Sequence, residues 1–322
     1  MVTSMTAHTA TRRGGRRVCL VAVHPAPDPA LPERISNHGL RMVEATLRAA
    51  GLADLDLLVL DLVAATPEDL ADAIEDFDPD IVGFSTYIWS LPLFADVIRR
   101  LHRGDPARVI VLGGPSAQPV MLDQPPFRDL RDPVAALVTG EGERTFLEIV
   151  AAPDRSPEAL LRIAGVAVHG PAGWSRSPAR PLEHLDDLAS PYVADLVPPG
   201  GPVVLQTYRG CPFTCAFCEW GVLESPRRVR SRGHLAAELA AATRLGLSPA
   251  EIRSGLEGAR PAAHRMCPVR HASRPIFVLD DCYNANPASS RAALEAIVAL
   301  REPGSRLVAV LGAVKVIGRR VG

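Results

Sequence analysis

The chain contains almost no lysine. Of its 35 basic residues only Lys315 is a lysine, and the others are arginines. An enzyme that forms a Schiff base with its substrate needs a lysine, and so does a phosphate-binding loop of the GxxxxGK[ST] type. Any such mechanism that uses a residue before position 315 is therefore excluded. The formal net charge of −1 at pH 7 also argues against nucleic-acid binding driven by bulk charge.

The chain also lacks a long hydrophobic run. No apolar stretch approaches the roughly 20 residues that a membrane-spanning helix requires. Arginines precede the apolar run 18–23, but this run is shorter than the core of a secretory signal and ends at His24-Pro25. We therefore expect residues 1–16 to be a disordered leader. We also expect a cytoplasmic protein that does not associate with a membrane.

Apolar runs alternate with amphipathic patterns between residues 17 and 152. Continuous apolar strands that alternate with helices are typical of a parallel sheet covered on both faces. The sequence therefore predicts an α/β fold, with a Rossmann-like parallel-sheet domain over 17–152. The predicted strands are 18–23, 55–62, 80–85, 109–112 and 135–139, and the predicted helices are 38–50, 66–77, 93–102 and 144–151. Thr66 is expected to cap the helix 66–77, with Pro67 in its first turn.

Small residues follow three of the predicted strands. These stretches read Gly83-Phe84-Ser85-Thr86-Tyr87, Gly113-Gly114-Pro115-Ser116 and Gly140-Glu141-Gly142-Glu143. In a parallel sheet the ligand lies beyond the carboxyl ends of the strands, and glycine lets a large flat or phosphate-bearing ligand approach the backbone. A Gly-Gly-Pro stretch alone would indicate only a turn. Three such ends on one edge favour a ligand site.

The second half of the chain divides into three further segments. Residues 153–200 are rich in Pro, Gly and Ser and are expected to be a linker that docks on the first domain, with a short β-like piece around 163–168. Residues 201–245 are expected to begin a second domain, with a strand at 203–207 and a helix at 234–245. The sequence pattern of residues 246–322 differs from those of the linker and of the segment 201–245.

Three of the six cysteines are crowded into one short stretch. Cys211, Cys215 and Cys218 have the spacing C-x3-C-x2-C, which indicates metal binding rather than a disulfide framework. Three thiolates can hold three irons of a [4Fe–4S] cluster and leave the fourth iron open to an external ligand. Structural zinc would need a fourth ligand, for which His264 and Cys267 are the nearest candidates. An accidental triplet of buried thiols is the remaining alternative.

Five stretches of residues 18 to about 240 resemble the N-terminal two thirds of the cobalamin-dependent radical S-adenosylmethionine proteins. Their order and separation are similar to those of that family. The stretches are 80–85, 110–115, 140–143, 187–192 and the cysteine loop at 208–221.

This resemblance implies three cofactors and assigns residues to each. Cys211, Cys215 and Cys218 would ligate a [4Fe–4S] cluster, and Phe217 would pack beside the adenine of S-adenosylmethionine. The residues that would line cobalamin are Ser85, Thr86, Gly113, Gly114, Gly140 and Glu141. An electron donor such as flavodoxin or ferredoxin is also implied, whereas the small-molecule or peptide substrate is not identified. An Asp-x-His-x-x-Gly motif is missing, so neither His24 nor His38 is assigned to cobalt.

Residues 246–322 resemble a fragment of the Mur ligase that attaches D-alanyl-D-alanine to the peptidoglycan precursor. The resemblance rests on the stretches 247–252, 265–266, 280–287 and 308–312, and Tyr283-Asn284-Ala285-Asn286-Pro287 is the most specific part. Ligase activity is not expected, because the phosphate-binding loop is missing. As an alternative, 275–281 would be the second strand of an incomplete (β/α) barrel that the cysteine loop begins.

The sequence therefore predicts a radical S-adenosylmethionine protein with a cobalamin-binding domain. It would cleave S-adenosylmethionine reductively, for radical chemistry or for methyl transfer. Two alternatives remain: a cobalamin- or nucleotide-binding module without catalysis, from a truncated or fused reading frame, and an inactive peptidoglycan ligase relic.

Overall fold

A computed structural model describes most of the first 197 residues and shorter pieces of the rest. The described residues are 16–26, 36–197, 204–210, 227–244, 246–258, 267–270 and 277–280, with a few isolated positions between 294 and 309. The chain divides into two compact units, one of Met1–Thr207 with Val229–Gly246 and one of Tyr208–Arg228 with Leu247–Gly322. Within the described residues no helix is both long and apolar enough to cross a membrane.

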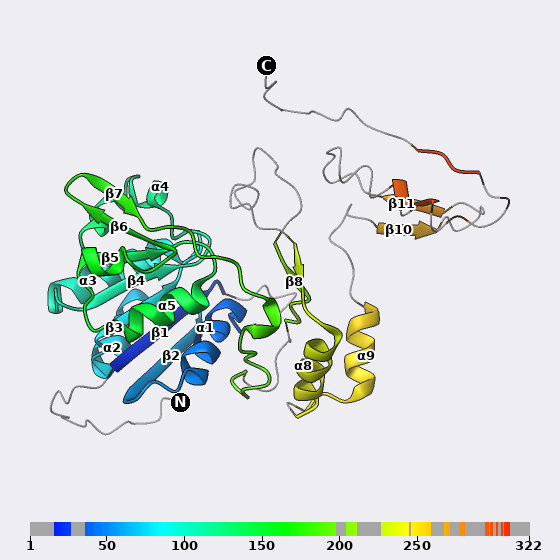
Figure 1. Ribbon diagram of the computed structural model, residues 1–322, viewed down its shortest axis with the longest axis horizontal. Coiled ribbons are helices and arrows are strands. Elements are labelled where there is room, and N and C mark those ends of the chain that lie inside the picture. Colours follow the sequence, from blue (N-terminus) through cyan, green and yellow to red (C-terminus); the bar gives the residue numbers. More distant parts are fainter. Residues whose placement is uncertain are drawn as a thin grey trace, which may run out of the picture. The chain divides into compact units, whose positions relative to one another are not determined.

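The first unit is built on a seven-stranded sheet of order β2-β1-β3-β4-β5-β6-β7 (Figure 1). The first five strands in this order run parallel, and β6 and β7 are antiparallel additions at one edge. The predicted Rossmann-like parallel sheet is confirmed. The strands are β1 (Arg16–His24), β2 (Leu55–Val63), β3 (Ile81–Ser85), β4 (Val109–Gly113), β5 (Val134–Val138), β6 (Val166–Gly170) and β7 (Gly173–Arg176).

Helices connect these strands and cover both faces of the sheet. They are α1 (His38–Ala49), α2 (Pro67–Phe77), α3 (Leu91–Gly104), α4 (Pro119–Leu122), α5 (Gly142–Ala151) and α6 (Pro157–Leu160), with a 3-10 turn η1 (Arg128–Arg131). A second 3-10 turn η2 (Leu185–Asp187) and a helix α8 (Arg232–Arg244) follow the last strand of the sheet. The cap predicted at the start of α2 is present, since the Thr66 hydroxyl accepts a hydrogen bond from Asp69 N.

Strand β1 shows how the sheet is buried on both sides. Its alternate residues point to opposite faces, so Val18 and Leu20 pack in the core under α1 and α5 while Cys19 and Val21 pack under α2 and α3. Burial raises the pKa of the Cys19 thiol to about 12, so this cysteine remains a protonated core residue. With both faces covered, ligands can reach this sheet only at the ends of its strands.

Helix α5 lies very close to strand β3, and a glycine allows this approach. A Cβ atom at Gly83 would lie 2.7 Å from Cζ of the Phe146 ring. Phe146 is itself nearly buried in the core. Gly83 therefore fixes the depth at which α5 sits on the sheet, and with it the position of the loop that precedes α5.

Part of the segment predicted as a linker belongs to the sheet, because β6 and β7 lie within it. Other described residues of this segment contact the helices of the first domain. Arg180 donates to Thr145 Oγ1 at 2.8 Å and to Glu148 at 2.7 Å, both on α5. Leu185 and Leu188 pack against Met42 of α1.

The structure after residue 200 differs from the expected start of a barrel. The predicted strand at 203–207 is absent from the described residues 204–207, and the chain instead forms β8 (Tyr208–Arg209), which pairs with β9 (Arg228–Val229). The second unit contains α9 (Pro249–Gly258), β10 (Cys267–Arg270) and β11 (Phe277–Asp280). β11 pairs antiparallel with β10, whereas neighbouring strands of a (β/α) barrel are parallel.

Replacing Gly83 with alanine should destabilise the first unit. The added Cβ clashes with Phe146, and overpacking of this kind costs about 1–3 kcal/mol. Gly39→Ala is the matched control, because a Cβ there meets only Asn37 Oδ1, at 3.6 Å, and alanine favours the helix. Urea unfolding followed by circular dichroism measures both. A Gly83→Ala variant as stable as Gly39→Ala would contradict the close packing of α5 on β3.

Candidate functional site

The carboxyl ends of the parallel strands define the candidate site. Strand β1 pairs with β2 on one side and with β3 on the other. The connections from β1 and β3 therefore lead to opposite faces, and a crevice is expected where they diverge. His24 ends β1 and Ser85 ends β3, so these two residues mark this point of the edge.

The ends of β3 and β4 are locked together through their backbones. Thr86 N donates to Gly113 O at 2.7 Å, and Ser116 N donates to Thr86 O at 3.1 Å. Gly114 has φ +93°, and a Cβ on it would lie 2.9 Å from Thr86 O. Only glycine suits this position. The structure thus brings Ser85, Thr86, Gly113 and Gly114 together at one edge, as the sequence predicted.

The end of β5 provides an open stretch of backbone on the same edge. Gly140 has φ +82°, and a Cβ placed on it would meet no heavy atom of the described residues within 4 Å. Glu141 follows as the N-cap residue of α5. The predicted residues Gly140 and Glu141 therefore lie at the third strand end, where the backbone is accessible and the N-terminus of a helix begins.

An exposed aromatic pair, which the sequence analysis did not single out, follows β3. The rings of Tyr87 and Trp89 stack with centroids 4.5 Å apart and planes 15° from parallel. Trp89 is 49% exposed and Ile88 is 65% exposed, although the Ser90 hydroxyl fixes the turn by accepting from Tyr87 N at 3.0 Å. Their position directly after the end of a predicted strand is the sequence feature that could have indicated them. The pair offers a rigid apolar surface beside Ser85 and Thr86.

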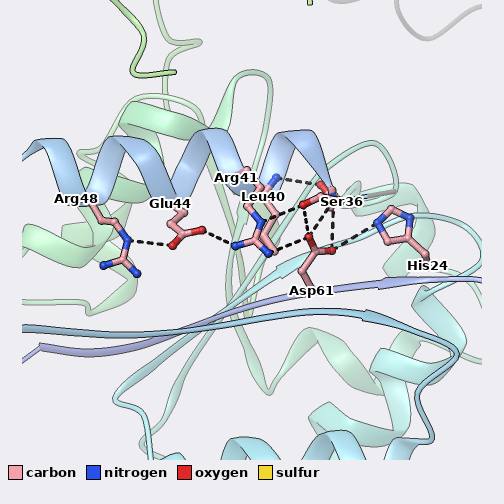
Figure 2. A network of polar contacts seen from close by, with 8 residues as sticks. His24, Ser36, Leu40, Arg41, Glu44, Arg48 and Asp61 are labelled. Atoms are coloured by element: carbon pink, nitrogen blue, oxygen red, sulfur yellow. Dashed lines mark hydrogen bonds and ion pairs between the residues drawn. The ribbon is translucent and has the colours of Figure 1, made fainter. Parts of the chain in front are cut away.

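A buried polar network organises the edge around His24 (Figure 2). Asp61 of β2 accepts hydrogen bonds from Ser36 Oγ at 2.5 Å and from Asn37 N at 3.1 Å. His24 Nε2 lies 3.6 Å from Asp61 Oδ1, and Arg41 Nη2 lies 3.3 Å from Asp61 Oδ2. Asp61 therefore joins the ends of β1 and β2 to the beginning of α1.

The same network continues along α1 as a row of alternating charges. Arg41 Nη1 donates to Glu44 Oε2 at 2.8 Å, and Arg48 Nε donates to Glu44 Oε1 at 2.9 Å. Figure 2 shows these side chains in order along one side of the helix. Glu44 and Arg41 are both buried, so each needs the other for charge compensation.

The electrostatics of Asp61 favour its charged form. Burial by itself raises the pKa of this carboxyl group. The neighbouring His24 imidazole, the donors at Ser36 and Asn37, and the positive charge of Arg41 outweigh burial, and together they hold the pKa below its ordinary value of 3.8. Asp61 is therefore a fixed negative charge beside the end of β1.

The predicted cluster ligands lie outside the described residues. Cys211, Cys215, Cys218 and Phe217 all fall between Gly210 and Arg227, where the structure gives no placement to compare with the sequence prediction. The residues that flank them are described. β8 pairs with β9, and the Arg227 guanidinium lies 4.9 Å from the centre of the Tyr208 ring.

A family model matches part of the first unit. Residues 31–150 match the family model described as the B12 binding domain. This range covers α1 to α5 and includes the three glycine-containing strand ends.

Two curated relatives extend the similarity. The chain is 31% identical over 174 residues to 2-(S-pantetheinyl)-carbapenam-3-carboxylate methyltransferase of Streptantibioticus cattleyicolor, covering 48% of this chain and 25% of that protein. It is 29% identical over 237 residues to the cobalamin-dependent radical SAM methyltransferase TokK of Streptomyces tokunonensis, covering 67% of this chain and 32% of that protein. The chain thus spans a quarter to a third of the length of these relatives.

Solved structures show a related fold. The cobalamin-dependent S-adenosylmethionine radical enzyme OxsB matches with a TM-score of 0.55 and 19% identity, covering 72% of this chain and 32% of that one. A structure of the same enzyme with aqua-cobalamin and S-adenosylmethionine bound gives a TM-score of 0.51. The similarities do not support the resemblance of residues 246–322 to a Mur ligase, which stays a hypothesis.

Replacing Asp61 with asparagine should destabilise the first unit in a pH-dependent way. Removing one partner of a buried charge network costs about 3 kcal/mol. Because the folded-state pKa of Asp61 is lowered, its contribution is fully present above pH 3.8, and it is lost as the pH falls through the folded-state pKa. Urea unfolding at a series of pH values should show the largest difference between wild type and variant near pH 7.

The control is Asp56→Asn on the same strand, where the carboxylate is exposed and pairs with Arg17 at 3.3 Å. This change should cost at most about 1 kcal/mol. Equal losses in the two variants, or a difference that does not shrink in acid, would contradict the role of Asp61.

Proposed function

We propose that the first unit binds cobalamin at the carboxyl ends of β1, β3, β4 and β5. The observation that carries this proposal is the edge formed by Thr86, Gly114 and Gly140, within the range that matches the B12 binding domain. Binding at a strand-end crevice of this sheet order is the general rule for open α/β folds.

The residues present fit a ligand of this kind. A corrin ring is a broad flat group with amide side chains and a nucleotide tail, so it needs accessible backbone and a polar rim. Gly140 leaves the backbone open, and the hydroxyl-bearing residues Ser85 and Ser116 lie at the end of β3 and just after β4. The stacked Tyr87–Trp89 pair supplies an apolar surface. When bound, cobalamin would supply a cobalt centre able to carry a methyl group.

We further propose that Cys211, Cys215 and Cys218 bind a [4Fe–4S] cluster and that the protein uses S-adenosylmethionine for methyl transfer or another radical reaction. The spacing of the three cysteines supports this, because it leaves one iron open. The similarity to TokK, whose name states this chemistry, also supports it. An electron donor of the flavodoxin or ferredoxin type would then be required. The substrate stays unassigned.

A second candidate is a cobalamin-binding module without catalysis. The antiparallel pairing of β10 with β11 favours it, because a radical enzyme of this class would continue as a parallel barrel. This candidate keeps the cobalamin site and predicts no cleavage of S-adenosylmethionine.

Trp89→Ala should weaken cobalamin binding by about tenfold, which corresponds to the loss of one well-packed aromatic contact. The measurement is a titration of the full chain with aqua-cobalamin, followed by absorbance and equilibrium dialysis. Leu182→Ala removes an exposed apolar side chain from the linker and should leave the affinity unchanged. If the wild-type chain retains no cobalamin, the proposed site is wrong.

Anaerobic reconstitution with iron and sulfide should give about four irons per chain, the stoichiometry of one [4Fe–4S] cluster. Cys215→Ala should lose the visible absorbance of the cluster. Cys267→Ala is the control and should retain it, because Cys267 belongs only to the zinc alternative. Zinc retained by the wild-type chain and released by Cys267→Ala would instead establish a zinc site. An assay for cleavage of S-adenosylmethionine by the reconstituted, reduced chain then distinguishes the two candidate functions. Cleavage indicates the radical enzyme, and its absence indicates the cobalamin-binding module without catalysis.

A further inference from the structure

A buried charged cluster lies at the start of α8. Arg230, two residues before the first residue of the helix, is 3% exposed, and Glu238 within the helix is 2% exposed. His234 lies between them, with Nε2 2.8 Å from Arg230 Nη1 and 3.1 Å from Glu238 Oε1. His234 Nδ1 lies 3.8 Å from Asp186 Oδ1. One guanidinium, one imidazole and two carboxylates therefore meet within the first unit.

This cluster attaches α8 to the linker. Arg230 Nη1 donates to Leu185 O at 2.6 Å, and Ser231 N donates to the Asp186 carboxylate at 3.1 Å. Beside these polar contacts Ala241 packs with Tyr192 and Val197 in a small apolar cluster. The beginning of α8 is thus bonded to the η2 turn. Ala241, near the end of α8, packs on residues that follow the η2 turn in sequence.

The linker also holds the chain where it leaves for the cysteine-bearing segment. The Tyr192 hydroxyl donates to Val204 O at 2.8 Å and accepts from Val204 N at 2.9 Å. Arg230 N, on the returning side, donates to Thr207 O at 3.0 Å. The outgoing and returning chain are therefore bonded to each other and to the same linker, and the three cysteines lie between them in sequence.

The guanidinium of Arg230 can stay in this position only if its charge is compensated. A buried cation is costly unless a buried anion and hydrogen bonds offset the loss of water. Glu238, which lies 3.1 Å from the His234 nitrogen that contacts Arg230, is the buried anion of this cluster. His234 Nε2 lies within hydrogen-bond distance of both groups. Since one imidazole nitrogen either donates or accepts, Nε2 can bond to Arg230 or to Glu238 but not to both at once. A glutamine side chain, with one acceptor and one donor, could serve both.

We propose that Arg230 is a positioning residue for the cysteine-bearing segment: it anchors the returning end of that segment to the η2 turn of the linker. Glu238 and His234 hold its guanidinium in place. The anchor is a property of the folded chain and does not need a bound cofactor.

Hydrogen exchange of the full, cofactor-free chain tests the anchor. In Arg230→Gln, the amides of Val204, residue 230 and Ser231 should exchange about 10- to 100-fold faster, as expected for the loss of a buried charged hydrogen bond. The amides of β1 and β3 serve as an internal reference and should not change. Arg232→Gln is the matched control, because this arginine is exposed and only two positions away.

Three further variants separate the anchor from general loss of packing. Glu238→Gln should accelerate the same amides, because it leaves the guanidinium without its counter-charge. His234→Leu should do so too, whereas His234→Gln should retain protection. Equal exchange in Arg230→Gln and Arg232→Gln overturns the proposal. If Arg230→Gln also accelerates exchange in β1 and β3, the comparison of His234→Leu with His234→Gln tests the proposal instead. Equal exchange in these two variants then overturns the proposal.

The consequence of the anchor for metal binding rests on the proposed function. If the wild-type chain takes up iron, Arg230→Gln should lose its cluster several-fold faster on exposure to a chelator than Arg232→Gln does. If the wild-type chain takes up no iron, the proposed cluster fails, while the exchange experiment on the cofactor-free chain still tests the anchor.

Discussion

The pairing of β1 with both β2 and β3 is the constraint on which the candidate site depends. Parallel strands bury both faces under helices, so the only accessible backbone lies where strands end. At that edge the chain places glycines at the ends of β4 and β5, stacked aromatic rings after β3, and an imidazole held by a buried carboxylate at the end of β1. Each of these features would be in the core or on an unrelated surface if the order of strands were different.

The parts of the first unit that the sequence predicted are those with a local signal. Apolar runs located all five parallel strands, and Thr66 was correctly assigned as a helix cap. The glycines at strand ends were recognisable because their positions follow such runs directly. The contact of His24 with Asp61 was not, since it depends on β1 and β2 lying side by side, and these residues are far apart in sequence.

Predictions failed where pairing rather than composition decides the structure. A short β-like piece was expected around 163–168 in the Pro- and Gly-rich linker, and it overlaps β6. The strand β7 and the pairing of both strands with the sheet were not expected. The strand expected before the cysteines is replaced by the two-residue strand β8, whose partner follows the cysteines. Arg230, Glu238 and Asp186 look like ordinary surface charges in the sequence. The burial of Arg230 and Glu238, and the contact of Asp186 with Ser231, follow only from the packing of α8 on the linker.

The two antiparallel strands decide at which side of the sheet the chain emerges. β5 ends at the carboxyl edge, β6 runs away from that edge, and β7 runs back toward it, so that Arg176 pairs with Ala167 beside Leu137. An even number of reversals restores the original direction, whereas a single added strand would have left the chain at the opposite side. Because the hairpin adds two strands, the part of the linker that follows β7 begins at the edge of the sheet that contains the candidate ligand site.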